Sequence, residues 1–152
     1  MIYLNIHEGF ENAVLPDVLE NTARAVLEEL CDQENPDLTI AIEDDEQLRT
    51  LNLQFLEIDA PTDVLSFPAE EIDPDSGNLY LGDIIISLPR ATAQAESAGH
   101  PVQAELQLLV IHGVLHLLGY DHVTPELKEE MWALQSEFLK KLNISIKKLS
   151  ED

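Results

Sequence analysis

Residues 112–122 read H-G-V-L-H-L-L-G-Y-D-H, and this stretch carries the strongest structural signal in the chain. His112 and His116 are four residues apart, so on a helix they lie on one face and can share one ion. Gly119 offers the left-handed backbone position that ends a helix, which allows the chain to turn and return His122 as a third ligand. Three neutral imidazoles leave the fourth position of a tetrahedral Zn²⁺ open for water, as in catalytic sites. We therefore predict a metal site at the end of a long helix, formed by His112, His116 and His122.

The alternative is that the three are separate, satisfied histidines on a buried helix. We favour the shared site because the helix, the glycine that breaks it and the returning histidine form the context that the motif requires. The expected cofactor is one Zn²⁺ per chain, with Ni²⁺ as another candidate. Copper and iron also suit three imidazoles, so the residues alone leave the metal open.

The same spacing belongs to the long zinc motif of metzincin proteases, which place a glutamate directly after the first histidine. Here that position is Gly113. Without the carboxylate, the usual peptidase mechanism lacks the group that takes a proton from zinc-bound water. A zinc peptidase would need a base from elsewhere, so we expect a different hydrolytic reaction.

Two further blocks accompany the histidine block: P-T-D-V-L-S-F-P at 61–68 and L-G-D-I-I-I-S at 81–87. In their order and separation, the three together resemble the YbeY-type endoribonucleases, metal-dependent factors of bacterial ribosomal RNA maturation. The resemblance covers nearly the whole chain and implies one such domain over residues 1–152. It also implies a single-strand-type endoribonuclease acting in maturation of small-subunit (16S) ribosomal RNA and in ribosome quality control. The implied partners are ribosomal RNA and the small ribosomal subunit or its proteins, and the implied metal ligands are His112, His116 and His122.

One position departs from the family pattern. The family usually carries an arginine a few residues before the P-T-D-V-L-S-F block, facing the metal cleft, and the matching residue here is Leu56. A guanidinium suits a phosphate, and leucine cannot replace it. Arg49 and Arg90 are the candidates to supply the charge. The alternative, which we favour, is that each is a solvated surface arginine.

The net charge of −22, from 8 basic and 30 acidic residues, is unusual for a protein that acts on RNA. Binding of nucleic acid normally draws on lysines and arginines, and long-range repulsion should keep free RNA away at low salt. A bound metal could dominate the local charge of the cleft, or a ribosomal or protein partner could deliver the RNA. Alternatively, the acidity serves solubility.

Three aspartates in these blocks are candidate site residues. Asp121 precedes the third histidine and could orient a histidine or shuttle a proton as a catalytic residue, but it could equally cap the turn after Gly119. Asp63 and Asp83 could face the cleft, but hydrogen bonds to the backbone at strand ends explain them equally well.

Composition indicates an ordered globular domain of 152 residues with 45% hydrophobic and 25% charged residues. Cys31, the single cysteine, is expected to be a buried or half-buried structural thiol. The start of the sequence lacks the features of a signal peptide, and the apolar run at 106–118 is too short and polar to span a membrane. We therefore expect a cytoplasmic protein with no membrane association.

Hydrophobic periodicity predicts an α+β fold in one domain, a small mixed β-sheet packed with about five helices. In the helix at 44–55, Leu48, Leu51 and Phe55 are expected to face the core. A stripe of Leu127, Met131, Leu134, Phe138 and Leu142 is expected to pack the last helix. The tail from Lys147 is expected to be loose. The predicted strands are 1–7 (at an edge), 37–43, 62–67 and 78–88, with an acidic loop at 70–77, and the predicted helices are 16–33, 44–55, 89–98, 101–118 (the longest) and 124–142.

One rival function remains open besides the peptidase. A non-catalytic ribosome assembly factor could retain the metal for structure, and both Leu56 and the acidity favour it. An open coordination position would favour catalysis, whereas a fourth protein ligand would favour a structural metal.

Overall fold

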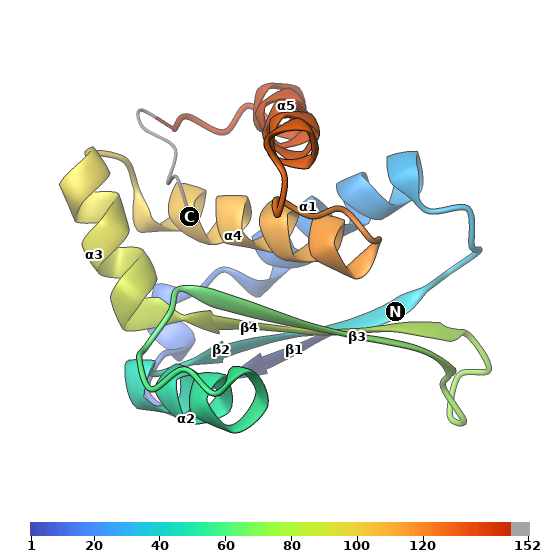
Figure 1. The fold of residues 1–152 in the computed structure, drawn as a ribbon, viewed down its shortest axis with the longest axis horizontal. Helices are drawn as coiled ribbons and strands as arrows, with labels where there is room; N and C mark the ends of the chain where they lie inside the picture. The colour runs from blue at the N-terminus through green and yellow to red at the C-terminus, as the bar shows by residue number, and fades with distance from the viewer. Residues whose placement is uncertain (147–152) are drawn as a thin grey trace.

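A four-stranded mixed sheet forms the base of the fold in the computed structural model, which describes residues 1–146 (Figure 1). The order across the sheet is β1–β2–β4–β3, in which β1, β2 and β4 run parallel and β3 runs antiparallel to β4. The α+β class and the mixed sheet are therefore confirmed. The strands are β1 (Ile2–Ile6), β2 (Asp37–Glu43), β3 (Val64–Ile72) and β4 (Leu79–Ser87).

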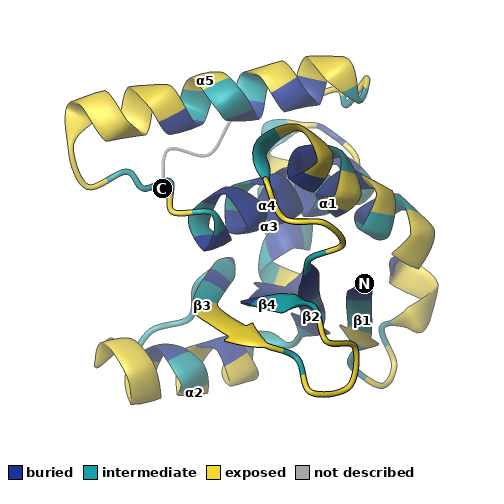
Figure 2. Ribbon diagram, turned by 90° about the vertical axis from the view of Figure 1, so that its right-hand side faces the viewer, coloured by how far each residue is buried: buried dark blue, intermediate teal, exposed yellow. Residues whose placement is uncertain are grey.

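Helices cover both faces of this sheet, as Figures 1 and 2 show. Helix α2 lies on one face, α1 and α4 lie on the other, and α5 packs outside α4. Figure 2 shows α4 buried along most of its length, whereas α2 and α5 expose their outer faces. The helices are α1 (Pro16–Leu30), α2 (Asp45–Leu56), α3 (Leu88–Ala98), α4 (Val102–Leu117) and α5 (Pro125–Lys141), with a short 3₁₀ helix η1 (Glu11–Ala13).

Helix α4 packs against the sheet at Gly113. A Cβ atom at this position would lie 2.7 Å from Cγ2 of Ile84 on β4, closer than real Cβ contacts allow. Only glycine therefore permits this approach of helix and strand. The position that carries the glutamate in metzincins is directed here at the sheet and has no space for a side chain.

A Schellman motif ends α4 at Gly119, which has a φ of 100°. The Gly119 N–H donates to the carbonyl of His116 at 3.0 Å, and the Tyr120 N–H donates to that of Leu115 at 3.0 Å. These bonds satisfy carbonyls at the helix end and reverse the chain within a few residues. The predicted turn at Gly119 is confirmed.

Several predicted boundaries need correction. The first helix ends at Leu30, not at residue 33, because Cys31 adopts an extended conformation; its thiol is half-buried, as expected. The strand predicted at 62–67 continues to Ile72, so the first part of the predicted acidic loop is the exposed end of a hairpin strand. At 17 residues, α5 exceeds α4 at 16, so the helix that carries the histidines is not the longest of those described.

Two predicted core residues are also exposed. Phe55, predicted to face the core, is 56% exposed at the end of α2, and the buried positions of that helix are Leu48 and Asn52. Leu127, predicted to begin the apolar stripe of α5, is 40% exposed in the first turn of that helix. The predicted loose tail from Lys147 lies outside the described residues. Within residues 1–146, no helix is long and apolar enough to cross a membrane.

Candidate metal centre

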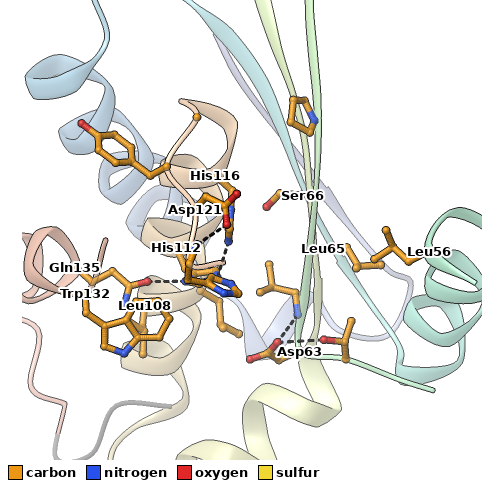
Figure 3. Close-up of a pocket in the computed structure, with 17 residues that line it drawn as sticks. Leu56, Asp63, Leu65, Ser66, Leu108, His112, His116, Asp121, Trp132 and Gln135 are labelled. Atoms are coloured by element: carbon orange, nitrogen blue, oxygen red, sulfur yellow. Dashed lines mark hydrogen bonds between the residues drawn. The ribbon is translucent and has the colours of Figure 1, made fainter. Parts of the chain in front are cut away.

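The three predicted histidines converge at the end of α4 (Figure 3). His112 and His116 lie on successive turns of the helix, and His122 returns from the turn that follows it. One nitrogen from each ring lies within 4.8 Å of the others, and Nε2 of His112 lies 3.1 Å from Nε2 of His116. No fourth His, Cys, Asp or Glu among residues 1–146 joins this group. The donor set is therefore three imidazoles, which suits a divalent transition metal.

Helix α5 orients His112. Nδ1 of His112 lies 2.6 Å from Oε1 of Gln135, whose side chain is buried. Because a carbonyl oxygen only accepts, Nδ1 carries the proton and Nε2 keeps its lone pair for an ion. The Trp132 ring meets His112 and His122 edge-on, with centroid distances of 5.8 and 5.6 Å.

His116 is held neutral by its surroundings. Burial, together with the neighbouring His112 and His122, lowers its pKa to about 4, and the nearby Asp121 carboxylate opposes part of the shift. At neutral pH, His116 therefore presents an unprotonated nitrogen, which metal binding requires.

Asp121 shapes the turn that delivers the third histidine. Its Oδ1 accepts from the N–H groups of His122 at 2.5 Å and Val123 at 2.9 Å. This is the turn-capping role that we weighed against a catalytic one. Asp121 also lines the cavity beside the histidines, so its catalytic role stays a prediction.

The histidines open into a cavity of about 540 Å³ between α4 and β3. Figure 3 shows two walls: His112, Trp132 and Gln135 on one side, and Leu65 and Leu56 on the other. Pockets of this size hold small ligands, so the open side of the metal group faces space that a substrate can enter.

The two other candidate aspartates lie in different places. Asp63 lines the cavity, and its Oδ1 accepts from the Val64 N–H at 2.8 Å. Asp83 does not line the cavity; it accepts a hydrogen bond from the Tyr80 hydroxyl. The sheet register shifts next to Gly82, whose φ is 139°. The structure thus brings Asp63 to the site and leaves Asp83 outside it.

Leu56 lines the cavity, as its family position implies, and is 53% exposed. Neither candidate arginine replaces the missing charge. Arg49 pairs with Asp59 at 2.7 Å, Arg90 pairs with Asp45 at 3.0 Å, and both are partly exposed and absent from the cavity wall. The interpretation of both as surface arginines is confirmed.

Gln135, Trp132 and Ser66 also line the cavity but were not predicted as site residues. The sequence does contain a signal for Gln135, because a polar residue within the apolar face of α5, between Met131 and Phe138, indicates a specific buried contact. Trp132 lies on the adjoining part of that face. Ser66 sits within the P-T-D-V-L-S-F block, where strand alternation alone does not distinguish the cavity side.

The fold and the three-histidine group define a class: a small α+β protein with a candidate metal centre in an open cleft. The family model described as endoribonuclease YbeY matches residues 5–143. The endoribonuclease YbeY of Bifidobacterium longum is 41% identical over 128 residues, covering 82% of this chain and 70% of the relative. That of Mycobacterium sp. strain KMS is 40% identical over 133 residues, covering 83% and 75%. The chain therefore belongs to the YbeY endoribonuclease family.

A solved structure agrees with the fold. The solution structure of TM1509 from Thermotoga maritima superposes with a TM-score of 0.60 at 26% sequence identity. The match covers 99% of this chain and 97% of that one, so the likeness extends over the whole arrangement of sheet and helices.

Proposed function

We propose that this protein is a metal-dependent endoribonuclease that cleaves single-stranded segments of small-subunit (16S) ribosomal RNA during maturation and quality control of the ribosome. The observation that carries the proposal is the group of three histidines facing an open cavity in a chain of the YbeY endoribonuclease family.

His112, His116 and His122 would hold the metal through their ring nitrogens, and their donor set fits Zn²⁺, with Ni²⁺ as the second candidate. A divalent ion held there would supply an activated water near neutral pH, or charge stabilisation at a phosphoryl oxygen. Gln135 fixes the ring of His112, and burial keeps His116 unprotonated.

Asp121 is the side chain that we assign to proton transfer. Both of its backbone hydrogen bonds use Oδ1, which leaves Oδ2 as the atom that can take a proton from an attacking hydroxyl group. The carboxylate lines the cavity, so a substrate can reach it. Because the turn fixes its position, Asp121 would need no rearrangement to act.

The second candidate function is a metal-stabilised assembly factor without catalysis. Leu56 favours it, because the cavity wall lacks the arginine that the family usually carries. The donor set argues against it. The three histidines have no fourth ligand among residues 1–146 and open on a cavity, which is the arrangement of a catalytic site. A zinc peptidase gains no support, since Gly113 has no room for the missing base.

Ribosomal RNA, together with the small subunit or its proteins, is the partner that we propose, acting in the cytoplasm. The charge of −22 supports delivery of the RNA by a partner, because free RNA would be repelled at long range. Cleavage within a ribosomal particle should therefore be faster than cleavage of the same RNA alone.

The test is cleavage of structured ribosomal RNA by metal-loaded protein, beside metal-free protein and His116→Ala, over a series of salt concentrations. We expect cleavage only by the metal-loaded wild type, strengthening as salt screens the repulsion. Stoichiometric metal without cleavage, both on RNA and on small-subunit particles, would favour the assembly factor.

A further inference from the structure

The cavity that faces the histidines has no basic side chain in its wall. Its lining includes Leu56, Asp63 and Asp121, but no lysine or arginine of the described chain. Every phosphodiester of a bound RNA carries a negative charge, and a divalent ion on the three histidines would balance that charge at the phosphate beside it only. A neighbouring phosphate of the same strand would need a cation of this chain close to the cavity.

Most of the basic side chains in residues 1–146 are engaged elsewhere. Arg24 pairs with Glu20 at 2.9 Å, and Lys141 pairs with Glu29 at 3.3 Å. Arg49 and Arg90 pair with aspartates, as described above. Lys128 and Lys140 are the remaining two, and neither has a carboxylate oxygen within 4.0 Å in the described structure.

Lys128 is the one of these two beside the cavity. Its Nζ lies 5.5 Å from the ring centroid of Trp132, and that ring lines the cavity and contacts His112 and His122. Lys128, Trp132 and Gln135 follow one another at helical spacing on one face of α5, and the last two line the cavity. Because α5 begins at Pro125, just after His122, this face starts next to the metal group.

The contact with Trp132 positions the ammonium group without neutralising it. A cation over an aromatic ring keeps its full charge, and the face of indole attracts it more than other aromatic faces do. The flexible stem of lysine then allows Nζ to reach a phosphate oxygen. Lys140, twelve residues further along α5, is near the opposite end of the helix and touches none of these groups.

We propose that Lys128 binds a backbone phosphate of the RNA on the α5 side of the cavity, opposite Leu56. The proposal rests on the proposed function, since it assumes that RNA enters this cavity. The positively charged side chain that contacts the RNA would therefore come from α5. The opposite wall, where the family usually carries an arginine, is apolar at Leu56.

The test is binding of a fluorescently labelled single-stranded RNA of about 12 nucleotides to metal-free and metal-loaded protein. Salt would be varied between about 25 and 200 mM. We expect Lys128→Ala to weaken binding roughly 5- to 10-fold at low salt. The loss of one phosphate contact should also shift the slope of log K against log salt by about +0.7, whatever the sign of the wild-type slope. Lys128→Arg should retain binding, and Lys140→Ala, the matched control, should leave affinity and slope unchanged.

Three results would overturn the proposal: no measurable RNA binding by the wild type, equal losses in Lys128→Ala and Lys140→Ala, or a lower melting temperature in Lys128→Ala with an unchanged salt slope. The last would mean that Lys128 only packs on Trp132. Wild-type protein that binds the RNA but cleaves neither free RNA nor particles would contradict the proposed function and leave Lys128 as a binding residue. Cleavage by both wild type and Lys128→Ala, with equal RNA binding, would contradict the role of Lys128 and leave the proposed function intact.

Discussion

Gln135 holds His112 by a hydrogen bond of 2.6 Å between Oε1 and Nδ1, and this contact fixes which nitrogen of the ring faces the metal group. The two residues come from different helices, so packing of α5 on α4 sets the geometry of the candidate site. Loss of a group that orients a metal ligand in this way typically lowers metal affinity by about 10- to 100-fold.

Gln135→Leu should therefore weaken metal binding by about 10- to 100-fold while preserving the fold. Leucine fills a similar volume but leaves Nδ1 of His112 without this acceptor. The measurement is a competition titration with a metal chelator. Gln107→Leu is the control, because Gln107 bonds Thr22 at 3.1 Å instead of a histidine. Equal affinities of Gln135→Leu and wild type would contradict the orienting role.

His116→Ala should abolish stoichiometric metal binding, because two imidazoles without a third ligand hold a divalent ion weakly. Metal content after gel filtration, measured by elemental analysis, gives the answer. His7→Ala serves as the control, since His7 lies on the surface near Glu43. A His116→Ala protein that still carries one tightly bound metal per chain would exclude the three-histidine site.

Gly113→Ala should lower the free energy of unfolding by about 1–3 kcal/mol, because its Cβ would overlap Ile84. In an Ile84→Ala background the same substitution should cost much less. Gly119→Ala is the comparison: no atom crowds its Cβ, but its φ of 100° makes it strained in either background. Urea unfolding of the single and double variants measures the coupling, and additive effects for Gly113 would contradict the close packing.

Protonation of His116 in the metal-free protein should occur near pH 4, since burial and the neighbouring histidines lower its pKa to about 4. In the unfolded chain the histidine takes up that proton near its ordinary pKa of 6.5, so this histidine makes the fold less stable as pH falls from about 6.5 to 4. An NMR titration of the imidazole Hε1 signals reports the midpoint. A midpoint near the ordinary histidine pKa of 6.5 would show that the ring is not desolvated.

Leu56→Arg should strengthen binding of single-stranded RNA, because it adds a cation to the cavity wall. It should also shift the slope of log K against log salt by about −0.7, the contribution of one added phosphate contact. Leu53→Arg, a similarly exposed position on α2 that does not line the cavity, is the matched control. Equal gains in both variants would indicate a general effect of net charge instead of a contact in the cleft.

Much of the candidate site could be predicted because its signals are local. The spacing of His112 and His116 and the helix-ending Gly119 lie within eleven residues, and their geometry follows from helix periodicity. Gln135 and Trp132 were missed because their role depends on how α5 packs on α4, which no local pattern encodes. Asp63 and Asp83 looked equivalent in sequence, and only the sheet geometry separates them.

The errors in the fold have similar causes. Phe55 has the spacing of a core residue, but at the end of α2 its ring contacts only the outer part of the fold, at Phe67 of β3, and remains 56% exposed. The acidic residues after Pro68 indicated a loop, yet pairing with β4 extends the strand and leaves their side chains in solvent. In both cases tertiary contacts outweighed the local preference.

The most direct test of the central claim is reconstitution: metal-free protein is titrated with Zn²⁺, and separately with Ni²⁺, while cleavage of small-subunit ribosomal RNA, free and in particles, is followed alongside bound metal. We predict that activity rises in proportion to bound metal, reaches its maximum at one ion per chain and is absent in His116→Ala. Cleavage that persists in metal-free protein, or a fully loaded protein that cleaves neither substrate, would contradict the account.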